Sequence, residues 1–351
     1  MKTKKPKQKV LVCMSGGVDS SVAAALLVSS KKYDVTGAFM INYDEPMPNG
    51  YSCYLPDYRD AVRVAAKLRI PILKLDFTKE YREKVLSYMF EEYEKGRTPN
   101  PDVMCNSYVK FGSWLKKAEE LGFDYIATGH YANFFNGKLL KADDLNKDQT
   151  YFLHQLTLDQ LDKTLFPIGK YTKPEVRALA SKLDLPTAEK EESMGICFIG
   201  EVPMKEFLQK RIKPTPGNIV MSDGKVIGSH DGLPFYTIGE RHVGVKTDKN
   251  EALYVVAKNI KTNELVVGYE NDKLLYSKKI ELERVNWINR VVLPLRCEVR
   301  LRHRQPLQKC LVKNIDSKIF IEFEKPQKAI TPGQFAVLYK NDECLGGGAV
   351  K

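Results

Sequence analysis

The chain has 351 residues, of which 43% are hydrophobic, and its 55 Lys and Arg residues outnumber its 44 Asp and Glu residues. This length favours two or three domains, and the net charge of +11 favours an anionic partner such as nucleic acid. No apolar run approaches the roughly 20 residues of a membrane span, and seven cysteines without a Cys-x-x-Cys pair indicate neither a zinc site nor a disulfide framework. We therefore expect a cytosolic protein with mostly reduced thiols and no membrane partner.

The first 130 residues alternate between short apolar runs and helical patterns. Strands are predicted at 10–14, 35–41, 71–77 and 125–128, and helices at 22–31, 57–68, 81–93 and 109–121. Repeated units of this kind predict a parallel, doubly wound sheet. Ligands of such sheets bind at the carboxyl ends of the strands, which is where the segment 15–21, Met40 and Gly129-His130 fall.

The segment Ser15–Ser21, with the sequence Ser-Gly-Gly-Val-Asp-Ser-Ser, joins the first strand to the first helix. Its glycines let the backbone approach a phosphate, the helix N-terminus favours an anion, and Asp19 suits a phosphate-bound Mg²⁺. The lysine of a Walker loop is missing, because no Gly-Lys is followed by Ser or Thr. An ordinary turn with Asp19 or Ser20 as N-cap is the alternative. The whole string resembles the pyrophosphate loop of the N-type ATP pyrophosphatases, which cut ATP between its α and β phosphates.

Two further segments each contain a cysteine in a distinctive setting. Two prolines and two asparagines predict a loop at 96–106, in which Asp102 lies three residues before Cys105. The apolar segment 195–200 places Cys197 between two glycines. Structural roles stay open for both segments: a turn-capping Asp beside an idle thiol in the first, and a buried strand in the second. His130 is likewise either a strand-end surface residue or a functional group.

The remainder of the chain changes character near residue 203. Thr172 to Glu175 predicts a capping box that opens a structural helix. A short helix is predicted at 205–211, a hairpin at 218–228 and a strand pair at 253–267, and the alternating residues from 279 onward predict a small barrel. Arg300, Arg302 and Arg304 would share one strand face, which favours RNA binding over a merely solvated face.

Several segments together resemble one family, the tRNA-specific 2-thiouridylases. They are 15–21, 97–106, 195–200, 331–334 and 344–348, with 127–131 and 147–149 matching in the same order. The resemblance spans nearly the whole chain and implies an α/β fold with an N-type ATP-pyrophosphatase domain, built on a Rossmann-like parallel sheet, at 1–205. A small central β domain at 206–278 and a tRNA-contacting C-terminal β-barrel at 279–351 would follow. In two departures from the family pattern, His303 stands where a tyrosine is common and Met194 where a threonine is frequent.

The resemblance implies that sulfur replaces the C2 oxygen of the wobble uridine in tRNA, with ATP converted to AMP and pyrophosphate. Cys105 would be the nucleophile, Cys197 the persulfide carrier and Asp102 a proton shuttle. ATP, with Mg²⁺ near Asp19, would be held by Cys13, Met14, Ser15, Gly16, Gly17, Val18, Asp19, Ser20, Met40 and Gly129. The target base would be faced by Asn100, Pro101 and Asp102. The tRNA would be contacted by Lys147, Asp148, Gln149, Arg302 and His303. Substrate would be positioned by His130 and Gln334.

The family further implies tRNAs that read Lys, Glu and Gln codons, and a cysteine desulfurase or a sulfur-relay protein as donor. The terminal sulfur either attacks C2 directly or leaves as hydrosulfide when Cys105 attacks the persulfide. Both routes end with Cys105 and Cys197 joined in a disulfide that must be reduced. Two other hypotheses remain: an ATP pyrophosphatase that makes an amide on a small molecule, and a non-catalytic RNA-binding protein.

Overall fold

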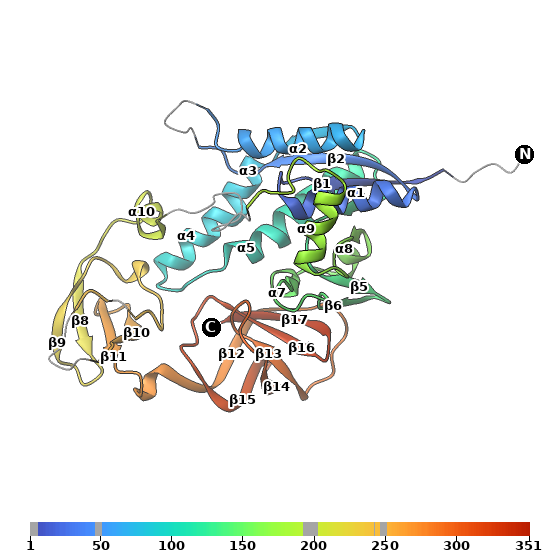
Figure 1. Ribbon diagram of the computed structural model, residues 1–351. Helices are drawn as coiled ribbons and strands as arrows, with labels where there is room; N and C mark the ends of the chain where they lie inside the picture. Colours follow the sequence, from blue (N-terminus) through green and yellow to red (C-terminus); the bar gives the residue numbers. More distant parts are fainter. Residues whose placement is uncertain (1–5, 46–50, 192–202, 242, 246–250) are drawn as a thin grey trace, which may run out of the picture.

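The computed structural model describes residues 6–45, 51–191, 203–241, 243–245 and 251–351, which form three parts (Figure 1). The first part is built on five parallel strands in the order β3-β2-β1-β4-β7. These strands are β1 (Gln8–Cys13), β2 (Tyr33–Ile41), β3 (Ile72–Asp76), β4 (Tyr125–Ala127) and β7 (Thr164–Leu165). The predicted parallel, Rossmann-like sheet is confirmed, and the carboxyl ends of β1, β2 and β4 meet at one edge of it.

The strands of this sheet carry apolar side chains on both faces, and helices on both sides bury them. Val10, Val12 and Met14 pack towards α1 (Val18–Ser30) and α2 (Leu55–Leu68). Leu11 and Cys13 pack on the opposite face, against two longer helical segments. The first segment runs from α3 (Thr78–Tyr81) through a π-helical turn (Arg82–Leu86) into α4 (Ser87–Glu94). The second runs from α5 (Pro101–Met104) through a π-helical stretch (Cys105–Ser113) into α6 (Trp114–Glu120).

The prediction of a loop at 96–106 is wrong in its second half. The helix begins at Pro101, and the Asn100 side chain accepts a hydrogen bond from the Val103 N–H at 3.2 Å. An asparagine N-cap followed by a proline at the first helical position is a helix-start signal that proline counting alone misses. Cys105 therefore lies on a helix and not in a loop.

The remaining helices of the first part lie between β6 and the segment that leads to the central part. They are α7 (Thr150–Leu153), α8 (Leu158–Asp162) and α9 (Lys173–Lys182). The predicted capping box at Thr172 is confirmed, since its side chain accepts from the Glu175 N–H and the Glu175 carboxylate accepts from the Thr172 N–H. Among the described residues, no helix combines the length and the apolar character needed to cross a membrane.

The central part is a small four-stranded sheet in the order β10-β11-β8-β9. Helix α10 (Met204–Gln209) precedes β8 (Gly217–Met221) and β9 (Val226–His230), and a short 3₁₀ turn (Leu233–Phe235) leads on to β10 (Tyr254–Asn259) and β11 (Glu264–Gly268). The predicted hairpin and the second predicted strand pair are both confirmed, and both pairs are antiparallel. Gly224, at the tip of the first hairpin, has a φ of +90°, a conformation that glycine adopts without strain.

The C-terminal part is the predicted β-barrel, and it follows a 3₁₀ turn at Lys273–Leu275. Its strands are β12 (Tyr276–Trp287), β13 (Leu295–Arg300), β14 (Gln308–Ile315), β15 (Lys318–Lys328), β16 (Phe335–Lys340) and β17 (Glu343–Val350). β12 pairs with both β15 and β17, which closes the ring. A hairpin of the first part, β5 (Asn133–Phe135) and β6 (Lys138–Leu140), pairs with β17. Backbone hydrogen bonds therefore join the barrel directly to the parallel-sheet part.

Candidate active site

The segment 15–21 forms a tight cradle at the N-terminus of α1. Gly16 has a φ of +78°, and a Cβ on it would lie 2.3 Å from the Asp57 carbonyl oxygen, so only glycine fits. The helix begins at Val18 with Gly17 as N-cap, so the alternative that made Asp19 or Ser20 the cap is wrong. The first backbone N–H groups of a helix have no acceptor within it. They favour an anion such as phosphate at this position.

Side chains within the cradle fix its shape. The Ser20 hydroxyl accepts from the Ser15 N–H at 3.2 Å and donates to the Gly17 carbonyl at 3.1 Å. The Ser21 hydroxyl also donates to that carbonyl, at 2.7 Å. The loop after β4 closes on the same point, because a Cβ on Gly129 would lie 2.6 Å from the Ser20 nitrogen. Three strand ends are predicted to lie at the ligand site, and the loops that follow two of them, β1 and β4, are thus in contact.

Asp19, the carboxylate proposed for Mg²⁺, has two partners among the residues that the structure describes. Its Oδ1 accepts from the Lys173 ammonium at 2.7 Å and from the Tyr131 hydroxyl at 2.9 Å. The sequence predicts Lys173 only as part of a helix start, and no local signal in the sequence links it to the loop. Among the described residues, no group of three His, Cys, Asp or Glu side chains is arranged to hold a metal ion. A metal here would need phosphate oxygens in addition to Asp19.

A pocket of about 210 Å³ lies at the carboxyl ends of β2 and β3, and its lining begins at Ile41, the residue after Met40. Its walls include Asn42, Tyr43, Asp76 and Tyr81. Asn42 is 2% exposed, and neither polar atom of its amide has a hydrogen-bond partner among the described residues. An unpaired buried amide costs free energy, so its retention in a pocket indicates a polar ligand.

Cys105 has no exposed surface and packs in the core beneath β1 and β2. Its backbone N–H donates to the carbonyl of Asp102, one helical turn earlier. Residues three apart lie on the same face of a helix, so the Asp102 carboxyl and the Cys105 thiol are on one side. Cys197 and the segment 195–200 lie outside the described residues.

The barrel holds the loop that leads to this helix. The Gln334 amide donates to the carbonyls of both Thr98 and Pro99, at 2.9 Å each. The Thr98 N–H donates to the Pro332 carbonyl at 2.9 Å. Gln334, expected to position substrate, therefore contacts the loop that leads to Cys105.

An ionic network continues this contact. The Arg97 guanidinium lies 2.9 Å from a carboxylate oxygen of the buried Glu92 and 2.5 Å from Glu283 on β12. It also donates to the Val350 carbonyl at 3.0 Å. Breaking a buried pair of this kind leaves an uncompensated charge, so the network ties α4, the loop and the barrel together.

His130 is nearly buried, with 9% of its surface exposed, and its Nδ1 lies 2.8 Å from the Thr128 hydroxyl. Burial, with the positive charge of Lys110 adding to it, lowers the pKa of His130 well below its usual range. The imidazole is therefore neutral at pH 7. It can orient a substrate by hydrogen bonding but does not supply a proton as an imidazolium.

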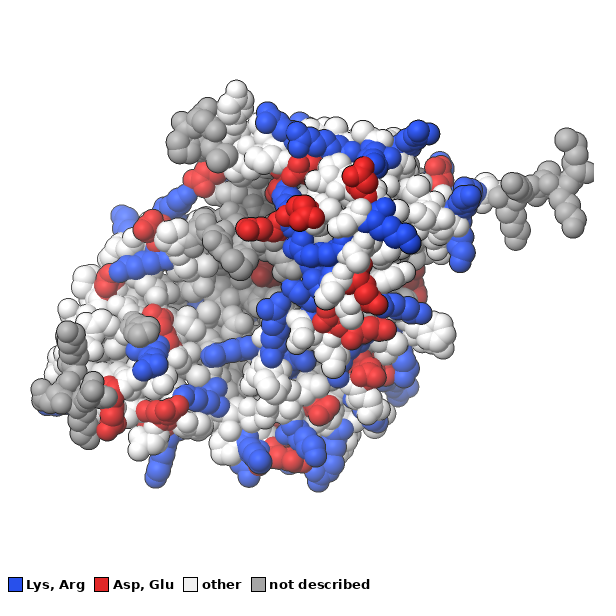
Figure 2. Space-filling view, in the orientation of Figure 1, with Lys and Arg blue, Asp and Glu red and all other residues white. Residues whose placement is uncertain are grey.

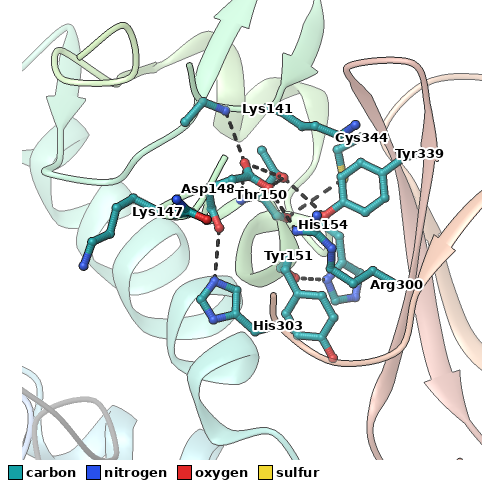
Figure 3. Close-up of polar contacts among 12 residues, drawn as sticks. Lys141, Lys147, Asp148, Thr150, Tyr151, His154, Arg300, His303, Tyr339 and Cys344 are labelled. Carbon is teal, nitrogen blue, oxygen red and sulfur yellow. Dashed lines mark hydrogen bonds and ion pairs between the residues drawn. The ribbon is translucent and has the colours of Figure 1, made fainter. Parts of the chain in front are cut away.

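Asp148, expected to contact tRNA, is 1% exposed and has partners within the protein (Figure 3). Its carboxylate accepts from the Thr150 hydroxyl at 2.9 Å and pairs with Arg300 of the barrel at 3.4 Å. Its backbone carbonyl lies 3.1 Å from His303 Nε2. In this arrangement Asp148 joins the two parts and does not reach the surface. Gln149 is also engaged, since its side-chain oxygen accepts from the Tyr131 N–H at 2.9 Å.

The expected arginine stripe does not form. β13 ends at Arg300, which is 9% exposed, so Arg302 and Arg304 lie in the following turn and not on the strand. Arg302 stays exposed, and one nitrogen of its guanidinium donates to the Ala329 carbonyl at 2.8 Å. The His303 ring packs against the Phe152 ring at a tilt of 52°, with ring centres 4.6 Å apart, and burial lowers the pKa of His303. Figure 2 shows a hollow between the parallel-sheet part and the barrel, with Lys and Arg side chains gathered along one side of it.

Comparison with known proteins gives matches over almost the whole chain. Three family models match in succession: "tRNA methyl transferase HUP domain" at 8–201, "tRNA methyl transferase PRC-barrel domain" at 205–269 and "Aminomethyltransferase beta-barrel domain" at 277–350. The tRNA-specific 2-thiouridylase MnmA of Limosilactobacillus reuteri is 45% identical over 97% of this chain and 95% of its own. The MnmA of Legionella pneumophila is 46% identical over 98% of this chain and 99% of its own.

Solved structures match less closely. A U34-tRNA thiolase, NcsA of Methanococcus maripaludis, is 21% identical, covers 59% of this chain and 64% of its own, and has a TM-score of 0.38. A likeness at this level carries no argument about function, and the full-length relatives are the informative matches.

Proposed function

We propose a two-step mechanism for this chain, which belongs to the family of tRNA-specific 2-thiouridylases and is a tRNA-uridine 2-sulfurtransferase. In the first step the C2 oxygen of the wobble uridine attacks the α phosphate of ATP, and pyrophosphate leaves. In the second step sulfur attacks C2, and AMP leaves with the original oxygen. Adenylation turns a poor leaving group into a good one, and positioning and electrostatics supply most of the catalysis.

The main support for the first step is the structure of the segment 15–21, which forms a cradle at the N-terminus of α1. Its N-terminal N–H groups, the required Gly16 and the contact between Gly129 and Ser20 support a phosphate site here. Mg²⁺, held by Asp19 and phosphate oxygens, would offset charge on the departing pyrophosphate. Cys13 and Met14, at the end of β1, are 8% and 1% exposed, so they support the cradle through packing.

The base of ATP would occupy the pocket beside Asn42. Neighbouring strands lie about 4.8 Å apart, so a nucleotide with its phosphates after β1 reaches the ends of β2 and β3 with its base. Met40 is the last but one residue of β2, and Asn42 follows the strand. An asparagine amide pairs with a base edge that presents a donor beside an acceptor, as adenine does.

In the second step Cys105 is the nucleophile and Cys197 carries the persulfide. A thiolate is the competent form of cysteine, and Asp102, on the same helix face, is the group placed to move protons. In one route the terminal sulfur of the persulfide attacks C2 and AMP leaves, and Cys105 then attacks the inner sulfur, which breaks the S–S bond and releases 2-thiouridine. In the other route Cys105 attacks the inner sulfur first, hydrosulfide leaves, and the hydrosulfide then attacks C2 and displaces AMP. In either case Cys105 and Cys197 end as a disulfide, and two external thiol groups supply the two electrons that reduce it.

The tRNA would lie across the hollow between the two parts, with Arg302, His303 and Lys147 at its rim. The wobble base must leave its stack to reach the site. We infer tRNAs of the Lys, Glu and Gln type, a cysteine desulfurase or sulfur-relay protein as donor, and domain divisions after residues 205 and 278.

The test is a reconstituted reaction with Cys105→Ser and Cys197→Ser. The wild-type protein, ATP, Mg²⁺, a cysteine desulfurase, cysteine and unmodified tRNA are combined, and 2-thiouridine is measured by mass spectrometry. Each variant should lose the product while keeping tRNA affinity. Cys344→Ser is the matched control, because this fully buried thiol lies in the barrel. Normal 2-thiouridine in either catalytic variant would overturn the mechanism.

A further inference from the structure

A lysine from a distant part of the chain lies at the pyrophosphate loop 15–21, which contains no lysine or arginine of its own. Lys173 comes 154 residues after Asp19, yet its ammonium lies 2.7 Å from the Asp19 carboxylate. The Lys173 side chain is 11% exposed, and its ammonium lies 5.9 Å from the centre of the Tyr131 ring. The ammonium is thus placed at the first turn of α1, where the backbone favours an anion.

The position of Lys173 is fixed by its surroundings. Lys173 is the first residue of α9, and its backbone N–H donates to the Asp144 carboxylate at 2.9 Å. The Thr172 capping box sets the entry of the helix, and Val176 and Ala180 pack in one cluster with Val22 of α1. Because α9 packs on α1 in this way, the backbone of Lys173 is held beside the loop.

We propose that Lys173 binds the β and γ phosphates of ATP and the pyrophosphate that leaves. This proposal rests on the function proposed above and names the group that receives the departing charge. An ammonium carries three N–H donors, and the charged oxygens of a phosphate bound at the first turn of α1 would be strong acceptors for them beside the Asp19 carboxylate. Lys173 would then do what the lysine of a Walker loop does, from a different helix.

The competing explanation is a purely structural ion pair between Lys173 and Asp19. The two explanations differ in their ligand dependence. A phosphate-binding Lys173 matters for ATP and pyrophosphate, which carry the β and γ phosphates, and not for AMP, which lacks them. A structural pair would affect all three ligands alike through the shape of the loop.

The test measures the affinities of ATP, AMP and pyrophosphate by calorimetry for wild type, Lys173→Met and Lys173→Arg. Lys182→Met is the matched control, because this exposed lysine lies at the far end of the same helix. We expect Lys173→Met to lose about 10- to 100-fold in affinity for ATP and pyrophosphate, with AMP affinity unchanged and with partial recovery in Lys173→Arg. Equal losses for all three ligands, or no loss, would overturn the proposal.

A second measurement uses the wild-type protein and so does not depend on how the variant folds. Acetylation of Lys173 by an amine reagent is followed by peptide mass spectrometry. Pyrophosphate should protect Lys173 and AMP should not, while Lys182 should react equally in all samples. Equal protection by AMP and pyrophosphate, or none, would contradict the proposal. If the proposed function itself is wrong, the wild-type protein will form no ATP-dependent 2-thiouridine, and this result is separate from the binding and acetylation results.

Discussion

Replacing Gln334 with Met should loosen the loop that leads to Cys105. The Gln334 amide donates to the carbonyls of Thr98 and Pro99 at 2.9 Å each. Methionine has a similar length but no donor, so the change removes both hydrogen bonds with little change in volume. The Thr98 N–H bond to Pro332 and the Arg97 ion pairs remain, so the loop should stay docked with weaker support.

The size of the effect follows from the two lost bonds. A typical hydrogen bond contributes about 1 kcal/mol net, so the docked loop should lose about 2 kcal/mol. A difference of 2 kcal/mol changes an equilibrium about 30-fold. Cys105 has no exposed surface and must open to react with a reagent. Its alkylation should therefore speed up by as much as about 30-fold, and turnover should fall while tRNA affinity is unchanged.

The assay is time-resolved alkylation of Cys105 by iodoacetamide, followed by peptide mass spectrometry. Gln308→Met is the matched control, because the Gln308 amide donates within the barrel, to the Pro306 carbonyl. The control should leave Cys105 alkylation at the wild-type rate. If Gln334→Met also alkylates at the wild-type rate, then Gln334 does not hold the loop.

Three further predictions concern the loop, the base pocket and pH. Gly16→Ala should abolish ATP-dependent pyrophosphate release, because its Cβ would lie 2.3 Å from the Asp57 carbonyl at a φ of +78°; release at the wild-type rate would contradict the cradle. Asn42→Leu should raise the free energy of unfolding by about 1–3 kcal/mol, since it removes buried polar atoms that have no partner among the described residues, yet weaken ATP binding in calorimetry; unchanged affinity would exclude Asn42 from the base site. Burial lowers the pKa of His154 to about 4 from its usual 6.5. Between these two pH values the unfolded chain binds a proton at His154 and the folded protein does not. The free energy of unfolding should therefore fall by about 3 kcal/mol as pH drops from 6.5 to 4. Urea denaturation of His154→Asn should show a clearly smaller fall, and an equal one would refute this origin.

The parallel sheet was predictable because its pattern is local. Short apolar runs alternated with helical stripes, and the Ser15–Ser21 string marked the first strand-to-helix turn. The hairpin around Gly224 and the alternation from 279 onward were equally local signals. The loop at 96–106 was predicted wrongly because Asn100 and Pro101 were counted as turn residues when they start a helix.

Contacts between distant segments were not predictable from the sequence. Nothing near Lys173 indicates that it meets Asp19, and nothing near Asp148 indicates that Arg300 buries it. The arginine stripe failed for a related reason, because the strand ends at Arg300 where the chain turns. Burial by a partner segment decides whether a charged residue faces solvent, and the sequence pattern alone does not give the partner.

The most direct test of the proposed mechanism follows one oxygen atom. An anticodon stem-loop RNA is synthesised with ¹⁸O at C2 of the wobble uridine and is thiolated by this protein with unlabelled ATP. Adenylation of the C2 oxygen predicts that AMP carries one ¹⁸O for each 2-thiouridine formed. AMP without ¹⁸O, alongside normal 2-thiouridine, would show that the base is never adenylated and would contradict the account.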